Sequence, residues 1–600
     1  MADLTPIVLC LSRAGEATAH RVAAALNAPV HGREGRVEKA DAFFPNALDH
    51  ARMLFQAGHP VIGVCAAGIL VRAVAPVLAD KRSEPPVLAI SDDGSTVIPL
   101  LGGHHGANRL AKQIAAALQS HAAVTTAGDV SLGIALDEPP AGWRLANPED
   151  AKPVMMALLN GQKPQIEGEN IWNLEAGNGP VKLVCSEAPV KTDSTVLAYH
   201  PQRFALGLGC ARGCEPAEMW ALVQESLQNA NIAPESIACV ASLDLKADEP
   251  AMIETAKRLG VPFRVFTAAE LEAEAARLAN PSDVVFAEVG CHGVAEGAAL
   301  ASTGAKGELA IEKRKTLNAT CAVARAEAPI MEFSGRARGK LSIVGIGPGQ
   351  HSWRTPEASV LISQAEELVG YGLYIDLLGP LAAGKKRSDF PLGGEEDRCR
   401  YALEQAGKGL NVALICSGDA GIYAMGALVY ELLDRGPEAM GVSDAARRIE
   451  VVSTPGVSAL QGAAARAGAP LGHDFCAISL SDLLTPREDI VKRLQAAAEG
   501  DFVIAFYNPV SKRRRTLLAE ARDILLEHRL PDTPVMLASN LGRPTETVRY
   551  VRLDALEVDD VDMLTVVLVG SSHSKLAALG EGPRMYTPRG YARKIDGDLA

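Results

Sequence analysis

The strongest constraint on the fold is the alternation, along nearly the whole chain, of short apolar runs with amphipathic helical patterns. Ile7–Leu11 and Val61–Cys65 are apolar runs of strand length, and Gly15–Leu26 and Ile69–Leu78 follow them with apolar residues at helical spacing. Strands that alternate with helices lie in a sheet whose faces those helices cover. We therefore predict an α/β fold with several domains.

Length, composition and charge narrow the class of protein further. The 600 residues correspond to about four domains of roughly 150 residues. With 48% hydrophobic and 22% charged residues, the composition is that of a globular protein and not of a disordered one. The net charge of −13 argues against nucleic-acid binding, because that affinity depends on Lys and Arg side chains that neutralise phosphates.

Further features of the sequence predict the compartment in which the protein works. No run of about 18 apolar residues predicts a transmembrane helix, and the N-terminal segment lacks the basic region of a signal peptide. The eleven cysteines are an odd number, and several lie in apolar runs, which argues against a disulfide framework. We expect a cytoplasmic protein that does not act at a membrane.

We also expect no metal ion held by the protein itself. Cys210 and Cys214 lack the second pair of ligands that a structural zinc site needs. His104 and His105 are adjacent, and neighbours in a helix do not face the same ion because faces repeat every three or four residues.

Shifts in composition divide the chain into units. The stretch after residue 136 is richer in Pro, Asn, Gly and Trp, and the stretch after 326 has no period, which is typical of a linker. In the third unit we predict strands over Ala205–Gly209, Ile237–Ser242, Phe263–Thr267 and Val284–Val289. The expected units are 1–136, a small central module 137–200, 201–326, a linker 327–339, and 340–600 with subdomains of about 340–453 and 454–600.

A glycine-rich loop opens the last unit. Gly345–Gly349 follows a buried strand and precedes a helix, so phosphate binding has to be considered. A dinucleotide fingerprint requires glycine where Gln350 stands, and Pro348 removes a backbone donor. The dinucleotide interpretation fails, and the loop taken alone is either a ligand contact or a tight turn.

Further blocks follow this loop in a fixed order. Together they resemble the tetrapyrrole methylases, which are S-adenosylmethionine enzymes with two α/β subdomains around a cleft. Ala420 replaces the proline of that family's common Gly-Asp-Pro, and the later blocks resemble the precorrin-3B C17-methyltransferase branch. The blocks are Leu341–Gly349, Thr355–Ala358, Cys416–Tyr423, Ser453–Ala459, Gly472–Phe475, Ser479–Pro486, Phe506–Arg514 and Asn540–Pro544.

The resemblance implies a cofactor, S-adenosyl-L-methionine, and a homodimer through the methylase domain. Gly418 and Asp419 lie just beyond a buried strand, where open α/β sheets bind ligands. Asp419 by itself would be read as a helix N-cap. The residues implied to bind the cofactor are Pro348, Ser417, Gly418, Asp419, Ile422, Ser458, Ala459 and Asn508.

Ring contraction in this branch also implies proton movement at a hydroxyl of the macrocycle, for which a base is suited. His473, Asp474 and Asp482 are the candidates, with hydrogen bonding in a loop as the alternative for the first two. Lys512 and Arg513 open a basic run that could bind the carboxylates of an anionic tetrapyrrole, or could simply be solvated.

The first 326 residues carry a second resemblance, to the cobalamin-synthesis protein that opens the δ-lactone of cobalt-precorrin-5A and releases acetaldehyde. The blocks that carry it are Asp80–Arg82, Leu101–Asn108, Thr125–Asp129, Leu206–Gly213 and Gly293–Ala298. They occur in the family's order and span almost the whole half of the chain.

Lactone hydrolysis requires an activated water and a group that stabilises an oxyanion. Glycines at a helix start supply backbone N–H groups for such an anion, so Gly103, His104, His105 and Asn108 are candidate substrate-binding residues. Glu296 is the candidate base, although it could equally be a first-turn helix glutamate. No Gly-x-Ser-x-Gly elbow is present, which disfavours an acyl-serine hydrolase.

We therefore predict a bifunctional enzyme of corrin synthesis: a methyltransferase fused to a lactone hydrolase. One alternative keeps the methyltransferase and makes the N-terminal half a non-catalytic corrinoid-binding or scaffold module. Another changes the tetrapyrrole carbon that is methylated. The expected partners are an anionic tetrapyrrole, with or without cobalt, and other corrin-pathway enzymes.

Overall fold

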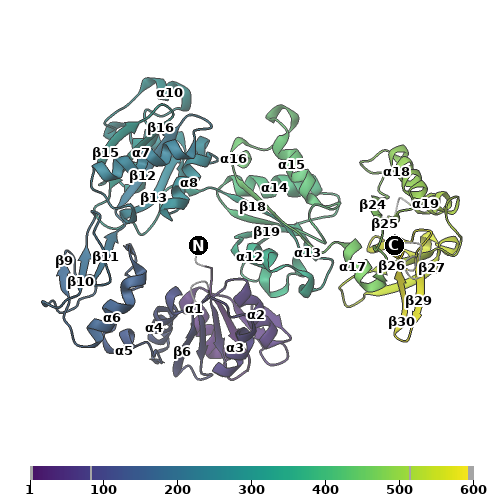
Figure 1. Ribbon diagram of the computed structural model, residues 1–600, viewed down its shortest axis with the longest axis horizontal. Coiled ribbons are helices and arrows are strands. Elements are labelled where there is room, and N and C mark those ends of the chain that lie inside the picture. The colour runs from purple at the N-terminus through teal and green to yellow at the C-terminus, as the bar shows by residue number, and fades with distance from the viewer. Residues whose placement is uncertain (1–3, 81–83, 512–514, 592–600) are drawn as a thin grey trace.

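The computed structural model describes residues 4–80, 84–511 and 515–591. It contains a series of separate sheets, most of them covered by helices, and this confirms the expected α/β, multidomain fold (Figure 1). All eleven cysteines are free. Within the described ranges no single helix is long and apolar enough to cross a membrane, and one pair passes that test only jointly across an 80° bend.

The N-terminal unit is a seven-stranded sheet of order β3-β2-β1-β4-β5-β6-β7, parallel except between β5 and β6. Its central strands are buried over their whole length, as their apolar runs predict. The strands are β1 Ile7–Cys10, β2 Val30–Arg33, β3 Ala42–Phe44, β4 Val61–Val64, β5 Val87–Ile90, β6 Thr96–Leu101 and β7 His121–Ala122. The helices are α1 Glu16–Leu26, α2 Ala47–Gln56, α3 Ala67–Val74, α4 Ala107–Leu118 and α5 Ala127–Ser131.

A small sheet of order β8-β11-β10-β9 follows, packed against helix α6 (Ala151–Leu159). The buried Tyr199 belongs to its core, and the hydroxyl of Tyr199 donates a hydrogen bond to the Leu136 carbonyl. The strands are β8 Trp143–Leu145, β9 Gln165–Glu167, β10 Lys182–Cys185 and β11 Val196–Pro201.

The third unit is a six-stranded mixed sheet of order β15-β16-β12-β13-β14-β17, in which β12, β13 and β14 are parallel. Its strands are β12 Phe204–Cys210, β13 Ile237–Leu243, β14 Phe263–Phe266, β15 Glu308–Lys315, β16 Ala319–Arg325 and β17 Arg336–Ala337. Its helices are α7 Pro216–Asn229, α8 Pro250–Leu259, α9 Ala268–Glu272, α10 Asp283–Val289 and α11 Val294–Thr303.

One local prediction in this unit is wrong. The segment Val284–Val289 is not a strand but lies in helix α10, because the Ser282 side chain caps the N–H of Val285 and Gly290 ends the helix in the left-handed conformation. The segment 327–339, predicted as a linker, lies between the third unit and the last one. It supplies β17, and Arg336 donates one hydrogen bond to Asp244 and another to the Gly407 carbonyl of the last unit.

The last unit begins with a five-stranded, fully parallel sheet of order β20-β19-β21-β18-β22. Its strands are β18 Lys340–Gly345, β19 Glu367–Tyr371, β20 Lys386–Phe390, β21 Asn411–Cys416 and β22 Glu450–Thr454. Its helices are α12 Pro356–Gln364, α13 Gly372–Asp376, α14 Glu395–Gly407, α15 Met425–Asp434 and α16 Asp444–Arg447.

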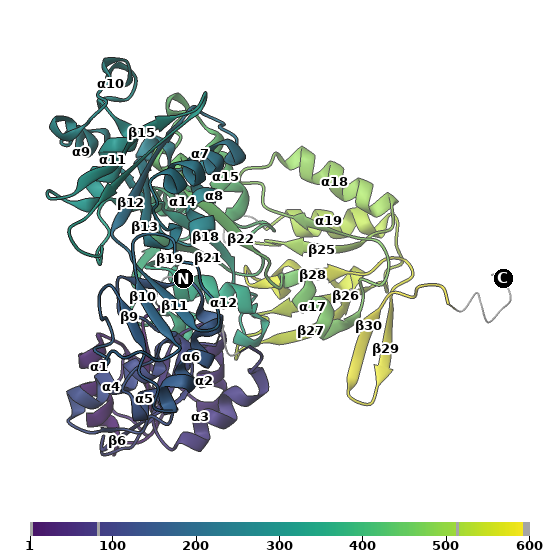
Figure 2. The same ribbon diagram turned by 60° about the vertical axis from the view of Figure 1, so that its left-hand side comes forward.

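A second sheet of order β24-β25-β28-β26-β27 follows, with β24 and β25 parallel, and the hairpin β29–β30 projects from it (Figure 2). Its strands are β24 Phe475–Ser479, β25 Val503–Tyr507, β26 Pro534–Ser539, β27 Thr547–Arg552 and β28 Thr565–Val569. The remaining elements are β23 Gly468–Ala469, β29 Lys575–Leu579, β30 Gly582–Tyr586, α17 Ala459–Ala467, α18 Arg487–Glu499 and α19 Leu517–Leu526.

The N-terminal unit shares a hydrophobic core with the last unit. Buried residues of α2 and β3, among them Leu54 and Phe44, belong to the same cluster as Ile362 of α12 and Leu381 of the 3-10 helix Gly379–Ala382. The Arg354 guanidinium lies 3.4 Å from the sulfur of Met53 across this boundary. The first and last units are therefore packed together although 200 residues separate them in sequence (Figures 1 and 2).

Three buried histidines lie beside this shared core. His31 Nδ1 is 3.0 Å from His50 Nε2, the His50 ring stacks on Phe44, and His59 Nδ1 is 3.0 Å from the Thr5 carbonyl. Burial lowers the pKa of His31 and of His59 to about 4 and that of His50 to about 3. The folded protein therefore holds all three rings neutral.

This cluster predicts a loss of stability in mild acid. The histidine pKa values are lower in the folded chain than the ordinary value near 6.5, so the unfolded chain binds more protons between pH 6.5 and 4. Each pKa unit corresponds to about 1.4 kcal/mol, and Lys385, which faces His59, adds repulsion when His59 is protonated. Thermal unfolding between pH 7.5 and 5 should show a falling midpoint, with a smaller slope in His50→Gln. An equal slope in the two proteins would contradict the prediction.

Candidate functional site

Three loops of the last unit meet at one edge of its parallel sheet. They follow β18, β21 and β22, which are neighbours, so their carboxyl ends lie side by side. Gly347 and Gly418 form an isolated antiparallel bridge, in which Gly347 N donates to the Gly418 carbonyl at 3.1 Å and Gly418 N donates to the Gly347 carbonyl at 2.9 Å. Two sequence blocks 70 residues apart are thereby joined directly.

Asp419 joins the second of these loops to the third. One carboxylate oxygen accepts a hydrogen bond from Gly421 N at 2.8 Å, and the other accepts one from Gly456 N at 2.9 Å. A Cβ on Gly456 would lie 2.2 Å from the Gly418 carbonyl oxygen, so only glycine permits this approach. Asp419 is therefore a connector between loops and not a helix N-cap.

The second sheet supplies the opposite side of this region. Ser458 caps α17 in a capping box with Gln461, and the Tyr507 hydroxyl accepts a hydrogen bond from Leu460 N at 2.9 Å. Burial raises the pKa of Tyr507. Asn508 follows β25 with a φ of +49°, and its side-chain amide donates to the Ser479 hydroxyl at 3.2 Å.

Tyr423 connects the two subdomains at the same place. It has a φ of +52°, and its hydroxyl donates a hydrogen bond to the Ala477 carbonyl of β24 at 2.8 Å. Its ring lies 5.2 Å from that of Tyr507. A non-glycine residue held in the left-handed region is uncommon and is often found at a functional site.

The block Asn540–Pro544 closes the region from the second sheet, since Arg543 Nε donates to the Pro348 carbonyl at 3.3 Å. Three further residues of this region, Trp353, Arg466 and Glu546, were not predicted from the sequence. The Arg466 guanidinium lies 4.6 Å from the Trp353 ring centre and 2.6 Å from a carboxylate oxygen of Glu546. Their separation in sequence gives no spacing signal that could have identified them.

The structure thus gathers the predicted cofactor residues on these loops. Pro348 lies in the first loop, and Ser417, Gly418, Asp419 and Ile422 lie in the second, where the Ile422 side chain is exposed. Ser458 and Ala459 lie at the start of α17, and Asn508 follows β25. Their role in cofactor binding stays a prediction.

The three candidate bases do not lie together. His473 and Asp474 precede β24, and their side chains are exposed and 3.4 Å apart, whereas Asp482 follows the other end of this strand. Five strand residues separate the two ends by about 15 Å. Asp482 lies at the edge where Asn508 also lies, because β24 and β25 are parallel. Lys512 and Arg513 lie outside the described residues.

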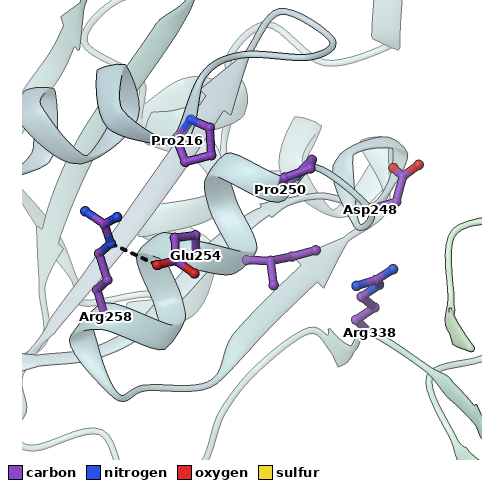
Figure 3. A pocket seen from close by; sticks show the side chains of 7 residues that line it. Pro216, Asp248, Pro250, Glu254, Arg258 and Arg338 are labelled. Atoms are coloured by element: carbon purple, nitrogen blue, oxygen red, sulfur yellow. Dashed lines mark hydrogen bonds and ion pairs between the residues drawn. The ribbon is translucent and has the colours of Figure 1, made fainter. Parts of the chain in front are cut away.

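A groove with a cavity volume of about 630 Å³ lies elsewhere, between α8, the start of α7 and Arg338 (Figure 3). Its charged side chains have partners. Arg258 pairs with Glu254 at 3.0 Å, and Arg338 donates to the Arg448 and Ile449 carbonyls. The groove contains none of the predicted site residues.

In the N-terminal unit the structure joins two of the sequence blocks. The Asn108 side chain donates hydrogen bonds to the Thr126 hydroxyl and to the Asp129 carboxylate, both at 2.9 Å, and Lys112 pairs with Asp129 at 2.6 Å. Gly103 and His105 lie exposed in the 3-10 turn before α4. The side chain of His104 lies outside the part of the chain that the structure describes.

In the third unit, helix α11 lies directly on strand β12. A Cβ on Gly207 would lie 1.9 Å from the Ala295 carbonyl oxygen. Glu296 is buried, and its carboxylate accepts hydrogen bonds from Asn280 N, Asn280 Nδ2 and Lys313 N, all at 2.9 Å. Burial alone would raise the pKa of Glu296, but these bonds outweigh burial and lower it.

The contact between α11 and β12 predicts that one added methyl group at Gly207 will strongly lower the stability of the protein. Gly207→Ala should force the helix away from the sheet and lower the free energy of unfolding by about 1–3 kcal/mol or more, as overpacking does. Gly103→Ala is the control, because nothing lies within 4 Å of a Cβ there. Chemical denaturation of both variants measures the difference. Equal stability of the two would refute the close packing.

Comparisons with known families agree with both resemblances. Residues 340–557 match the family "Tetrapyrrole (Corrin/Porphyrin) Methylases". Residues 49–129 match "Cobalamin synthesis G N-terminal", and residues 204–324 match "Cobalamin synthesis G C-terminus". Each glycine-rich loop cluster described above therefore lies inside a matched region.

Individual relatives match the last unit. A precorrin-3B C(17)-methyltransferase of Sinorhizobium sp is 42% identical over 255 residues, which are 42% of this chain and 98% of the relative. A probable cobalt-factor III C(17)-methyltransferase of Salmonella typhimurium is 44% identical over 251 residues, which are 42% of this chain and 99% of the relative.

The crystal structure of the methyltransferase CobJ is 38% identical with a TM-score of 0.39, and the match covers 42% of this chain and 100% of that one. The chain covers nearly all of a relative with which it shares 42% identity, so it belongs to the tetrapyrrole methylases. It is a protein of cobalamin biosynthesis in which one polypeptide joins this methylase to both regions of a cobalamin synthesis G protein.

Proposed function

We propose that the C-terminal half transfers a methyl group from S-adenosyl-L-methionine to C17 of precorrin-3B or its cobalt analogue, with ring contraction. The observation that carries this proposal is the junction of three loops, through Gly347, Gly418 and Asp419, at the carboxyl edge of a parallel sheet. Ligands of open α/β sheets bind at this edge. The similarity to C17-methyltransferases over nearly their whole length supports the substrate.

The residues at this edge suit the cofactor. The glycines let the loops at this edge approach one another closely, because a Cβ on Gly456 would lie 2.2 Å from the Gly418 carbonyl oxygen. The Thr454 hydroxyl, buried at the end of β22, has no hydrogen-bond partner among the described residues, so it can bond a polar group of a ligand. Asn508 and the exposed Ile422 add a polar and an apolar contact.

The bound cofactor supplies an electrophilic sulfonium methyl group. What the chain contributes is alignment, which can lower a barrier by about 7–11 kcal/mol when two reactants are held in place. Asp482 is the better candidate for moving the hydroxyl proton, since it lies at the same edge as Asn508, whereas His473 and Asp474 lie at the other end of β24.

For the N-terminal half we propose opening of the δ-lactone of cobalt-precorrin-5A. Both cobalamin synthesis G regions are present, and α11 carries one of the family blocks onto the glycine-containing strand β12. The homodimer, other corrin-pathway partners and the cytoplasmic location stay predictions.

Binding of S-adenosylhomocysteine tests the cofactor site. Gly456→Ala should weaken this binding at least tenfold, because the added methyl group separates the loop from the Gly418 carbonyl. Gly436→Ala is the matched control, since its Cβ would meet nothing within 4 Å, and it should bind like the wild type. Isothermal titration calorimetry measures both, and NMR of the product from precorrin-3B locates the methyl group. Wild-type affinity in Gly456→Ala would refute this site.

Release of acetaldehyde tests the other half. The full-length chain incubated with cobalt-precorrin-5A should release one acetaldehyde for each lactone opened, and a coupled alcohol dehydrogenase assay detects this product. Tight binding of the corrinoid without acetaldehyde would instead favour the non-catalytic binding module.

A further inference from the structure

His292 and Glu272 form a fixed pair in the third unit that the sequence blocks do not include. The Nδ1 atom of His292 lies 2.8 Å from a Glu272 carboxylate oxygen, and the backbone N of His292 donates to the other oxygen at 2.9 Å. The imidazole stacks on Phe286 with ring centres 4.4 Å apart. These contacts fix the ring and leave Nε2 on its outer side, 3.5 Å from the exposed Asp283.

The pair lies at the carboxyl edge of the third sheet. Leu271 and Cys291, the neighbours of Glu272 and His292, pack against Leu243 and Phe266, the last residues of β13 and β14. Gly209 near the end of β12 lies against Val294 at the start of α11. Three parallel strands therefore end beside this pair, which is where open α/β sheets bind ligands.

Glu296 and the pair of His292 and Glu272 differ in how far their side chains are exposed. Glu296 is buried, and three hydrogen bonds from its own domain surround it. The side chains of His292 and Glu272 are 28% and 32% exposed. A bond from the His292 backbone keeps the pKa of Glu272 low, so Glu272 is ionised and orients the imidazole. A histidine whose Nδ1 is oriented by a carboxylate, and whose Nε2 faces the solvent-exposed side chain of Asp283, is suited to general-base catalysis.

We propose that His292 is the general base of the lactone-opening reaction and that Glu272 is the positioning residue that orients it. This inference rests on the proposed function of the N-terminal half, and it replaces Glu296 as the base. The first-turn N–H groups of α11, a ten-residue helix, lie beside the pair and have no partners within the helix. They can donate to the oxyanion that forms on the lactone carbonyl.

The step conserves atoms and electrons without a further reactant. A water oxygen attacks the lactone carbonyl carbon while His292 Nε2 takes one proton from that water. The bond between this carbon and the ring oxygen then breaks, and the ring oxygen takes the proton from Nε2. Lactone and water become a carboxylic acid and an alcohol, and His292 returns to its neutral form. The alcohol then leaves as acetaldehyde: its O–H proton is lost, a C=O bond forms as the C–C bond to the macrocycle breaks, and the macrocycle carbon takes a proton, so no oxidant or reductant is needed.

The test uses the full-length chain with cobalt-precorrin-5A and follows acetaldehyde. His292→Gln should lower kcat by about 10²–10⁴-fold with KM little changed, as loss of a general base does. Glu272→Gln should lower kcat less, because the amide still accepts a hydrogen bond. His121→Gln, an exposed histidine on β7, is the matched control and should keep wild-type rates. Methyltransferase activity of the same chain reports whether each variant is folded.

Rescue by added imidazole distinguishes a catalytic role of His292 from a structural one. In His292→Ala, free imidazole should restore part of kcat in proportion to its concentration, which loss of a merely structural ion pair would not allow. Wild-type release by His292→Gln, or a defect that imidazole does not relieve in a folded variant, would overturn the role of His292 and leave the proposed function intact. A wild type that releases no acetaldehyde would overturn the proposed lactone activity and the role of His292 with it.

Discussion

Close approach of backbone to backbone is the constraint on which both candidate sites depend. Gly456 brings the loop after β22 against the Gly418 carbonyl, and Gly207 allows α11 to lie on β12, where a Cβ would be 1.9 Å from an oxygen atom. Any side chain at these positions would push the elements apart, because packed interiors have no free volume to absorb it. The absence of a Cβ at Gly456 and at Gly207 therefore determines where each candidate site can form.

Carboxylates tie neighbouring segments together in each of the three family-matched regions. Asp419 links two loops, and Asp129 links α4 to the segment of Thr126. Glu296 of α11 accepts three bonds from Asn280 and Lys313. The carboxylate of Glu296 is buried, so its hydrogen bonds also prevent the cost of a buried charge without partners. All three carboxylates lie in the sequence blocks that carry the two family resemblances.

The two halves of the chain are also packed against each other. The N-terminal sheet and the methylase sheet share a core through Leu54, Ile362 and Leu381, and Arg336 ties the third unit to α14. If either unit unfolds, the apolar surface buried between them becomes exposed, so each unit stabilises the other. The fusion is thus a matter of packing as well as of covalent connection, and three histidines whose pKa values are lowered by burial lie beside this core.

The sequence by itself determined the α/β class, the two family resemblances and the order of the glycine-rich blocks, because apolar periodicity and local backbone requirements are written in neighbouring residues. It misassigned Val284–Val289, where the caps Ser282 and Gly290 override strand-like valines, and it did not indicate the strand β17 within the predicted linker 327–339. Only the tertiary structure decided that Asp419 joins two loops, that Asp482 and His473 lie at opposite ends of β24, and that His292 meets Glu272. Asp419 and Gly456 are 37 positions apart, and His292 and Glu272 are 20 apart. Whether such residues meet depends on how sheets and helices pack, which no local pattern records.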